Sequence, residues 1–112
     1  MNFQFNNIHY HVKWDYTSTE MPYHKSKKEI MVNTRRTTCK ILDKSNKLIC
    51  QGSVLLSPKD QFLKYEGRKK SFLKALNLFF DGINKEQKRI GLKNIFEQLK
   101  QNDQLFIINC TI

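Results

Sequence analysis

The period of the hydrophobic pattern changes once along this chain, near Leu56, and this change limits the possible folds more than any other feature. Before it, large β-forming residues alternate with polar ones, as in strands with one buried face. After it, apolar residues recur every three or four positions, which is the spacing of an amphipathic helix. We therefore predict an α+β domain, in which an N-terminal antiparallel β-sheet carries two to three C-terminal helices on one face. The other face is left to a partner.

The first half is predicted to contain three strands, at residues 9–16, 30–42 and 48–56, because these segments are rich in β-branched and aromatic residues. Residues 43–46, Asp-Lys-Ser-Asn, have turn chemistry, so the last two strands form a hairpin. If Leu42 pairs with Lys47 across this turn, Cys39 lies opposite Cys50. Residues 17–28 contain Pro22 and many polar residues, and we predict a loop there.

The second half is predicted to be helical. Ser57 caps a helix that begins at Pro58 and is broken at Gly67, a second helix opens on Arg68 and ends near residues 81–82, and Asn84 caps a third. The apolar stripes of these helices are predicted to be core: Phe72, Leu73, Ala75, Leu76, Phe79, Phe80, Leu92, Ile95, Phe96 and Leu99. Residues 105–108 form a short apolar run, for which we predict a last strand.

Length and charge suit a single domain spanning residues 1–112 that binds anions. Twenty Lys and Arg oppose ten Asp and Glu, giving a net charge of +10, and the excess lies in residues 24–47 and 59–100. Such a field attracts the phosphates of nucleic acids or nucleotides, or an acidic protein, without choosing among them. Three cysteines without a CxxC pair, and no secretory or membrane-spanning segment, predict a soluble cytosolic protein.

Catalytic and metal-binding patterns are not evident. The sequence has no nucleophile elbow, phosphate loop, HExxH or paired-carboxylate motif, so we expect a protein that is not an enzyme and has no cofactor. Cys39 and Cys50 with His9 and His11 are the best candidates for a zinc site, but they lack the usual short spacings. We expect no metal.

The clearest candidate site is the start of the second predicted helix. Arg68, Lys69 and Lys70 stand where the helix dipole and the unpaired N–H groups favour an anion, so their charges oppose folding unless a negative ligand is bound. We therefore expect Arg68→Ala to weaken ligand binding and leave the fold intact. Arg35 and Arg36 are consecutive strand residues and face opposite sides of the sheet, so one of them at most serves the same site.

Residues 30–100 resemble a small family of phage-encoded proteins, the anti-Thoeris sponge proteins. The resemblance rests on five features: Arg36-Thr37-Thr38-Cys39, Ser57-Pro58-Lys59-Asp60-Gln61-Phe62 after Gly52, Gly67-Arg68-Lys69, a helix containing Ala75-Leu76, and Lys85-Glu86-Gln87-Lys88-Arg89.

This resemblance implies a non-catalytic protein of the host bacterial cytoplasm that sequesters a cyclic ADP-ribose-type signal made by a host TIR-domain protein. Some members also take up cyclic oligonucleotides at separate sites, and members assemble as homo-oligomers built from dimers. Arginine suits a pyrophosphate and an aromatic face suits an adenine. Together they imply these ligand-binding residues: Arg35, Arg36, Lys59, Phe62, Tyr65, Arg68, Lys69 and Arg89.

The alternative is a basic phage inhibitor that binds nucleic acid, or that blocks the nucleic-acid site of a host defence complex such as a CRISPR effector. Its support is a basic surface interleaved with aromatic residues, which suits phosphate contacts and base stacking. The aromatic residues concerned are Tyr10, Trp14, Tyr16, Tyr23 and Tyr65. Nucleic-acid binding should strengthen with oligonucleotide length, whereas a pocket for one small molecule should saturate.

Overall fold

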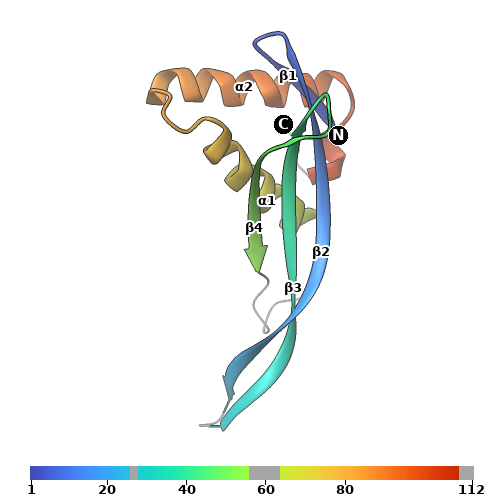
Figure 1. The fold of residues 1–112 in the computed structure, drawn as a ribbon, viewed down its shortest axis with the longest axis vertical. Helices are drawn as coiled ribbons and strands as arrows, with labels where there is room; N and C mark the ends of the chain where they lie inside the picture. Colours follow the sequence, from blue (N-terminus) through green and yellow to red (C-terminus); the bar gives the residue numbers. More distant parts are fainter. Residues whose placement is uncertain (26–27, 56–63, 109–112) are drawn as a thin grey trace.

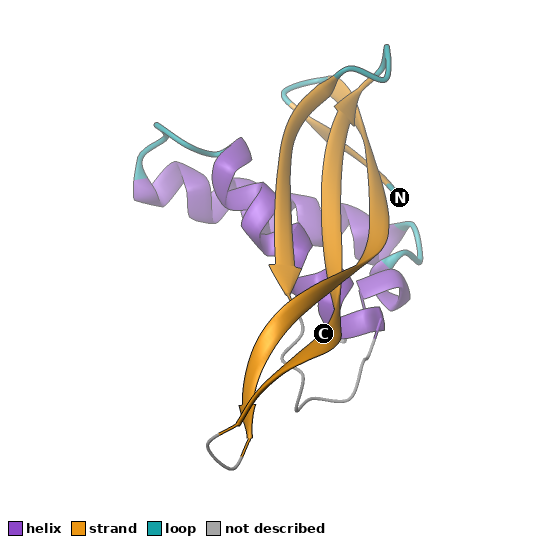
Figure 2. Cartoon of the chain, turned by 60° about the horizontal axis from the view of Figure 1, so that its bottom comes forward, coloured by secondary structure: helices purple, strands orange, loops and turns teal. Residues whose placement is uncertain are grey.

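The computed structural model describes residues 1–25, 28–55 and 64–108. They form one four-stranded antiparallel sheet, in the order β1-β2-β3-β4, with both α-helices on one of its faces (Figures 1 and 2). The elements are β1 (Asn2–Phe5), β2 (Ile8–Lys25), β3 (Lys28–Asp43), β4 (Leu48–Leu55), α1 (Lys64–Phe79), α2 (Lys85–Gln101) and a 3₁₀ helix, η1 (Leu105–Ile108). The predicted α+β class is confirmed, with two α-helices among the described residues. The helix start predicted at Ser57-Pro58 lies outside those residues.

The first strand, β1, was not predicted. Asn6 and Asn7 join it to β2 and both have positive φ, at 52° and 64°. A two-residue turn with this geometry matches the right-handed twist of a hairpin, and Asn tolerates the left-handed region better than most residues. Phe3 is buried and pairs with Tyr10. The sequence signal for this hairpin was therefore Asn6-Asn7, which stands between two runs of alternating apolar and polar residues.

The loop predicted at residues 17–28 is wrong, because β2 continues to Lys25 and remains paired with β3 as far as Lys25 and Lys28. The strand β4 ends at Leu55, opposite Arg36, so residues 18–25 and 28–35 form a two-stranded ribbon beyond the rest of the sheet. We call this ribbon the arm, and it gives the molecule its long axis of 53 Å (Figure 1). Pro22 is tolerated because a strand edge without a third strand needs no N–H donor there.

The β3–β4 hairpin is confirmed, with a shift in its register. Asp43 Oδ1 accepts hydrogen bonds from the N–H groups of Ser45 and Lys47, and Asn46 has a φ of 64°. Ile49 is an extra residue in β4, because Leu42 pairs with Leu48 and Ile41 pairs with Cys50.

The turn and the bulge together change the predicted partner of one cysteine, because Leu42 pairs with Leu48 and not with Lys47, and the bulge then moves the register by one further residue. Cys39 pairs with Gly52, and the predicted pairing of Cys39 with Cys50 is wrong. The position of a β-bulge could not be predicted from the sequence, so the register beyond it was wrong.

Gly67 does not break a helix, as the sequence had suggested, but lies inside α1 and allows that helix to approach the sheet. A Cβ atom on Gly67 would lie 2.6 Å from Thr37 Oγ1 of β3. A Cβ on Gly52 of β4 would lie 2.5 Å from the backbone N of Ala75 and 2.7 Å from the carbonyl oxygen of Ser71. These two glycines therefore let α1 lie against the Thr37 side chain of β3 and at backbone distance from β4.

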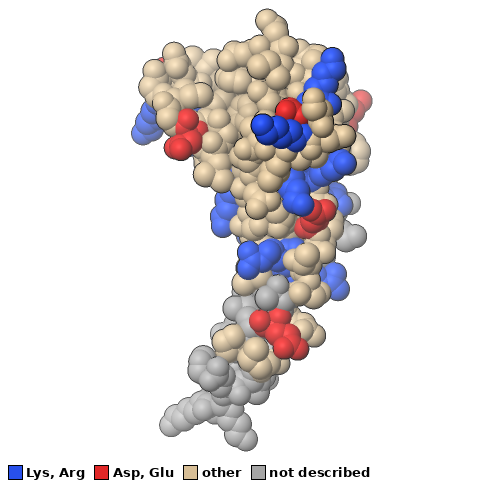
Figure 3. Space-filling model, in the orientation of Figure 1, with Lys and Arg blue, Asp and Glu red and all other residues tan. Residues whose placement is uncertain are grey.

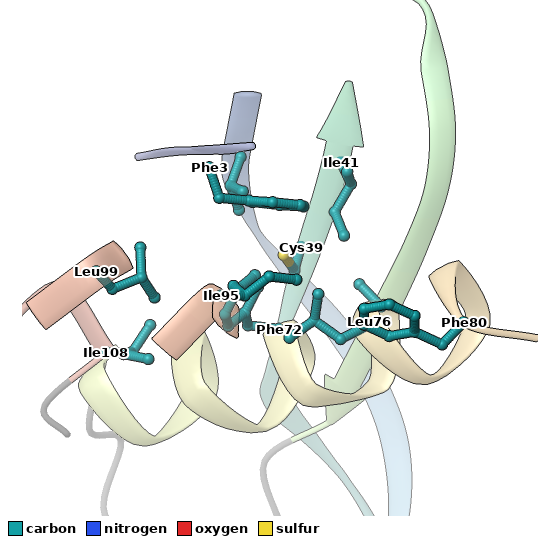
Figure 4. Close-up of a cluster of buried hydrophobic side chains, with 11 residues drawn as sticks. Phe3, Cys39, Ile41, Phe72, Leu76, Phe80, Ile95, Leu99 and Ile108 are labelled. Atoms are coloured by element: carbon teal, nitrogen blue, oxygen red, sulfur yellow. The ribbon is translucent and has the colours of Figure 1, made fainter. Parts of the chain in front are cut away.

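The core lies between the sheet and the two helices (Figure 4). Its buried members are Phe3, Val12, Cys39 and Ile41 from the sheet, Phe72, Ala75, Leu76 and Phe80 from α1 and the turn after it, and Ile95, Leu99 and Ile108. Most of the predicted stripe is therefore confirmed. Phe79, Leu92 and Phe96 are half-buried against this cluster, and Leu73 is at the surface.

The predicted cap of α2 is confirmed: Asn84 accepts a hydrogen bond from the N–H of Gln87 at 2.8 Å.

The strand predicted at residues 105–108 is wrong, because this segment is the 3₁₀ helix η1, with Ile108 buried. At the outer edge of β1, the side chains of Gln98 and Gln104 bond the backbone of Gln4 and Asn2. The edge nearest to η1 is thus closed to a further strand.

We predict that Gly52→Ala destabilises the protein by about 1–3 kcal/mol, near the upper end because the new methyl group meets helix backbone, which cannot rotate away. Chemical denaturation measures this. Gln51→Ala is the matched control, since Gln51 is the exposed neighbour on the same strand and its loss should change the free energy of unfolding by less than about 0.5 kcal/mol. Equal stability of Gly52→Ala and wild type would mean that α1 does not lie this close to β4.

Candidate functional site

Arg68 lies at the point where three elements meet. It stands one turn before Phe72 on the face of α1 that points to the core, and its side chain is half-buried. Its Nε donates a hydrogen bond to the Tyr16 hydroxyl of β2 at 2.7 Å, and its Nη1 donates to the Ile107 carbonyl of η1 at 3.1 Å. The carbonyl oxygen of Arg68 accepts a hydrogen bond from the Trp14 indole at 3.2 Å. The residue therefore links β2, α1 and η1.

This position corrects the prediction that a helix opens on Arg68. The described part of α1 already begins at Lys64, so Arg68 is in its second turn. The favourable field of a helix N-terminus declines within the first turn, and the N–H groups of residues 68–70 are not its unpaired ones. The contacts of the guanidinium also give Arg68 a structural role, contrary to the expectation that its removal leaves the fold intact.

The two consecutive arginines of β3 are separated by the sheet. Thr37 is buried beneath α1, where it faces Gly67. Because strand side chains alternate, Arg35 lies on this helix side and Arg36 on the opposite side. Tyr16 pairs with Thr37 and so also lies on the helix side, next to the position of Arg35. The structure thus brings Arg35, and not Arg36, to the same face as Arg68.

We call Tyr16, Arg35 and Arg68, with Lys69 next to Arg68 on α1, the arm junction, because Tyr16 and Arg35 lie where the arm leaves the rest of the sheet and Arg68 contacts Tyr16. Arg35 and Lys69 are exposed, and the Tyr16 side chain is 40% exposed. Figure 3, in which the sheet lies in front of the helices, shows that Lys and Arg side chains also gather on the opposite face, where the molecule narrows towards the arm. The arm junction is therefore an accessible basic surface with an aromatic ring in it.

Arg89 is not part of this surface. It lies in the second turn of α2, which follows the far end of α1 (Figure 1). The eleven helical residues after Arg68 span about 16 Å. Arg89 also forms an exposed ion pair with Glu86 at 2.7 Å. Among the other predicted ligand-binding residues, Lys59 and Phe62 lie outside the described residues, as does the side chain of Tyr65.

Sequence reasoning missed the role of Tyr16 and Trp14 at this site. Because Tyr10, Val12, Trp14 and Tyr16 are two residues apart, the sequence shows that they share one face of β2. The contact of Trp14 and Tyr16 with Arg68, however, depends on how far α1 extends over β2. That placement follows from the close approach at Gly67. A glycine inside a helical pattern was the available signal, and it was interpreted as a break.

The described thiols are unsuited to nucleophilic chemistry. Cys39 is fully buried, and burial raises its thiol pKa to about 12. Burial also raises the thiol pKa of Cys50, whose Sγ donates to the Ala75 carbonyl at 3.4 Å. Both are neutral thiols near pH 7, whereas the thiolate is the reactive form. Within residues 1–25, 28–55 and 64–108, no group of three or more His, Cys, Asp or Glu side chains is placed to hold a metal ion.

Comparison with models of protein families, with curated proteins and with solved structures gave no match for this chain. Neither described helix combines the length and the apolar character that a membrane-crossing helix requires.

We predict that Arg68→Ala lowers the free energy of unfolding by about 1–3 kcal/mol, because the Tyr16 hydroxyl and the Ile107 carbonyl lose a charged donor. Tyr16→Phe should cost about 0.5–1.5 kcal/mol. The double variant should cost less than the sum, since both changes remove the same bond. Thermal melts of the three variants measure this.

Lys69→Ala is the control for the removal of a cation from α1, and we expect its stability to match wild type within about 0.5 kcal/mol, because Lys69 is exposed. An Arg68→Ala protein that melts at or above the wild-type temperature would contradict the structural role of Arg68.

Proposed function

We propose that the protein binds an anionic nucleotide-type ligand at the arm junction and does not transform it. The observation that carries this proposal is the held guanidinium of Arg68, which lies on the same side of the sheet as the exposed Arg35. A guanidinium whose position is fixed before binding loses less conformational freedom when a phosphate arrives.

Phosphate is the anion best suited to this surface. Arginine presents paired N–H groups that match the spacing of two phosphate oxygens, and a second cation nearby suits a pyrophosphate. The exposed ring of Tyr16 offers a face for a base. The excess of positive charge, +10 over the whole chain, favours the approach of such a ligand.

Binding without turnover fits the remaining side chains. Cys39 and Cys50 are held as neutral thiols. On this basis, and on the resemblance of residues 30–100 to the anti-Thoeris sponge proteins, we propose that the ligand is a cyclic ADP-ribose-type immune signal, sequestered in the cytoplasm of a bacterial host. A two-stranded arm is marginally stable alone, which fits an assembly of several copies of the chain.

The neighbouring arginines of β3 provide the test. Arg35→Ala should weaken the binding of cyclic ADP-ribose by about 1.5–3 kcal/mol, the range for a charged hydrogen bond, as measured by calorimetric titration. Arg36→Ala is the matched control, because it removes the same charge one residue away on the opposite face. Ligand recovered after heat denaturation of the complex should be chemically intact. Conversion of the ligand, or the lack of saturable binding at micromolar concentration, would contradict the proposal.

The second candidate is nucleic-acid binding, either directly or as a block of a nucleic-acid site in a host defence complex. The arm favours it, because a two-stranded ribbon fits the major groove of DNA and Arg35 and Arg36 place cations on both of its faces. The same pair of variants separates the candidates. For nucleic acid, both substitutions should weaken binding, affinity should rise with oligonucleotide length, and it should fall steeply with salt.

A further inference from the structure

A second surface, unrelated to the arm junction, lies between α2 and the β1–β2 turn. Two adjoining hollows of about 480 and 520 Å³ share Asn6 and Asn94 and so form one groove along the helix. We call this the amide groove. Its more apolar end is lined by Phe5, Ile83, Gln87, Ile90 and Gly91, together with the two shared asparagines. Its polar end is lined by Gln4, Asn6, Asn7, Asn94, Gln98 and Asn102.

The lining of the amide groove carries no charge. The whole chain has thirty Lys, Arg, Asp and Glu among 112 residues, yet none of them lines either hollow. At the apolar end, Ile90 is 54% exposed and Ile83 is 36% exposed. A charged ligand would find no opposite charge here, and it would lose hydration against these side chains. The groove therefore selects for an uncharged ligand with an apolar part.

The polar end already binds one extended peptide segment, which is β1 itself. Gln98 Oε1 accepts a hydrogen bond from the Gln4 N–H at 2.8 Å, and Gln98 Nε2 donates to the Gln4 carbonyl at 2.7 Å. A carboxamide thus satisfies both backbone groups of one strand residue, as a neighbouring strand would. Gln98 Nε2 also donates to Asn94 Oδ1 at 2.7 Å, which fixes the orientation of the next carboxamide along the helix.

We propose that the amide groove binds an extended, uncharged peptide segment of a partner protein, with one aliphatic side chain at the apolar end. The carboxamides of Asn6, Asn94 and Asn102 bind its backbone N–H and C=O groups, in the way that Gln98 binds Gln4. The aliphatic side chain packs on Ile83, Ile90 and the Phe5 ring. This binding is independent of the anion proposed at the arm junction.

The test is a selection of random octapeptides displayed on phage against the immobilised full chain. The enriched peptides should be uncharged and contain a Leu, Ile or Val. In a titration of a soluble enriched peptide, Ile90→Lys should raise the Kd at least about tenfold, because it removes an apolar contact and puts a charge into the groove. Asn94→Asp, a change of one atom that keeps the acceptor for Gln98, should also weaken binding.

Leu78→Lys is the matched control, since Leu78 is 55% exposed on α1 and does not line the groove. Its Kd should equal that of wild type. All three positions are exposed, so thermal melts should show that the variants are folded. The proposal is overturned if no peptide is enriched, or if the enriched peptides are acidic and bind Ile90→Lys as well as wild type. It is also overturned if adenosine, and no peptide, shifts the amide resonances of residues 90–98 in an NMR titration.

Discussion

The contact on which the rest of this structure depends is the approach of α1 to the sheet at backbone distance. Gly52 and Gly67 lack the Cβ atoms that would hold the helix away from β4 and β3. With the helix that close, Phe72, Ala75 and Leu76 reach the sheet and close the core. The same approach puts Arg68 within hydrogen-bonding distance of Tyr16 and of η1. The proposed binding surface thus depends on the packing that lies beneath it.

The arm and the arm junction at its base differ in how they are supported. Beyond Leu55 the ribbon consists of β2 and β3 alone, so its backbone stability depends on what it contacts. The junction is anchored by α1 and η1, and the Arg68 guanidinium is held in place there without a ligand. An anionic partner would therefore meet a rigid base and an extended ribbon. The amide groove lies between α2 and the β1–β2 turn, towards the end of the molecule opposite to the arm (Figure 1), and its lining carries no charge.

The sequence predicted those parts of the fold that depend on local patterns. The change of period gave the α+β class, Asp43 and its neighbours gave the hairpin, and Asn84 gave the start of α2. It failed where tertiary contacts override local signals. Gly67 has the chemistry of a helix break but serves close packing, and the polar residues after Tyr16 continue as strand because β3 pairs with them. The predicted site was divided for the same reason: Arg68 and Arg35 lie on the same face of the sheet, whereas Arg89 lies in α2, beyond the far end of α1.

The central claim is that an anionic nucleotide binds on the helix side of the arm junction, and hydrogen exchange with and without cyclic ADP-ribose tests it most directly. The account predicts slower exchange on ligand addition in residues 14–18, 33–37 and 64–70, which supply or support the arm junction. It predicts no change in residues 85–101, which form α2 and line the amide groove. Protection confined to α2, or exchange that is the same in both samples at saturating ligand, would contradict the claim.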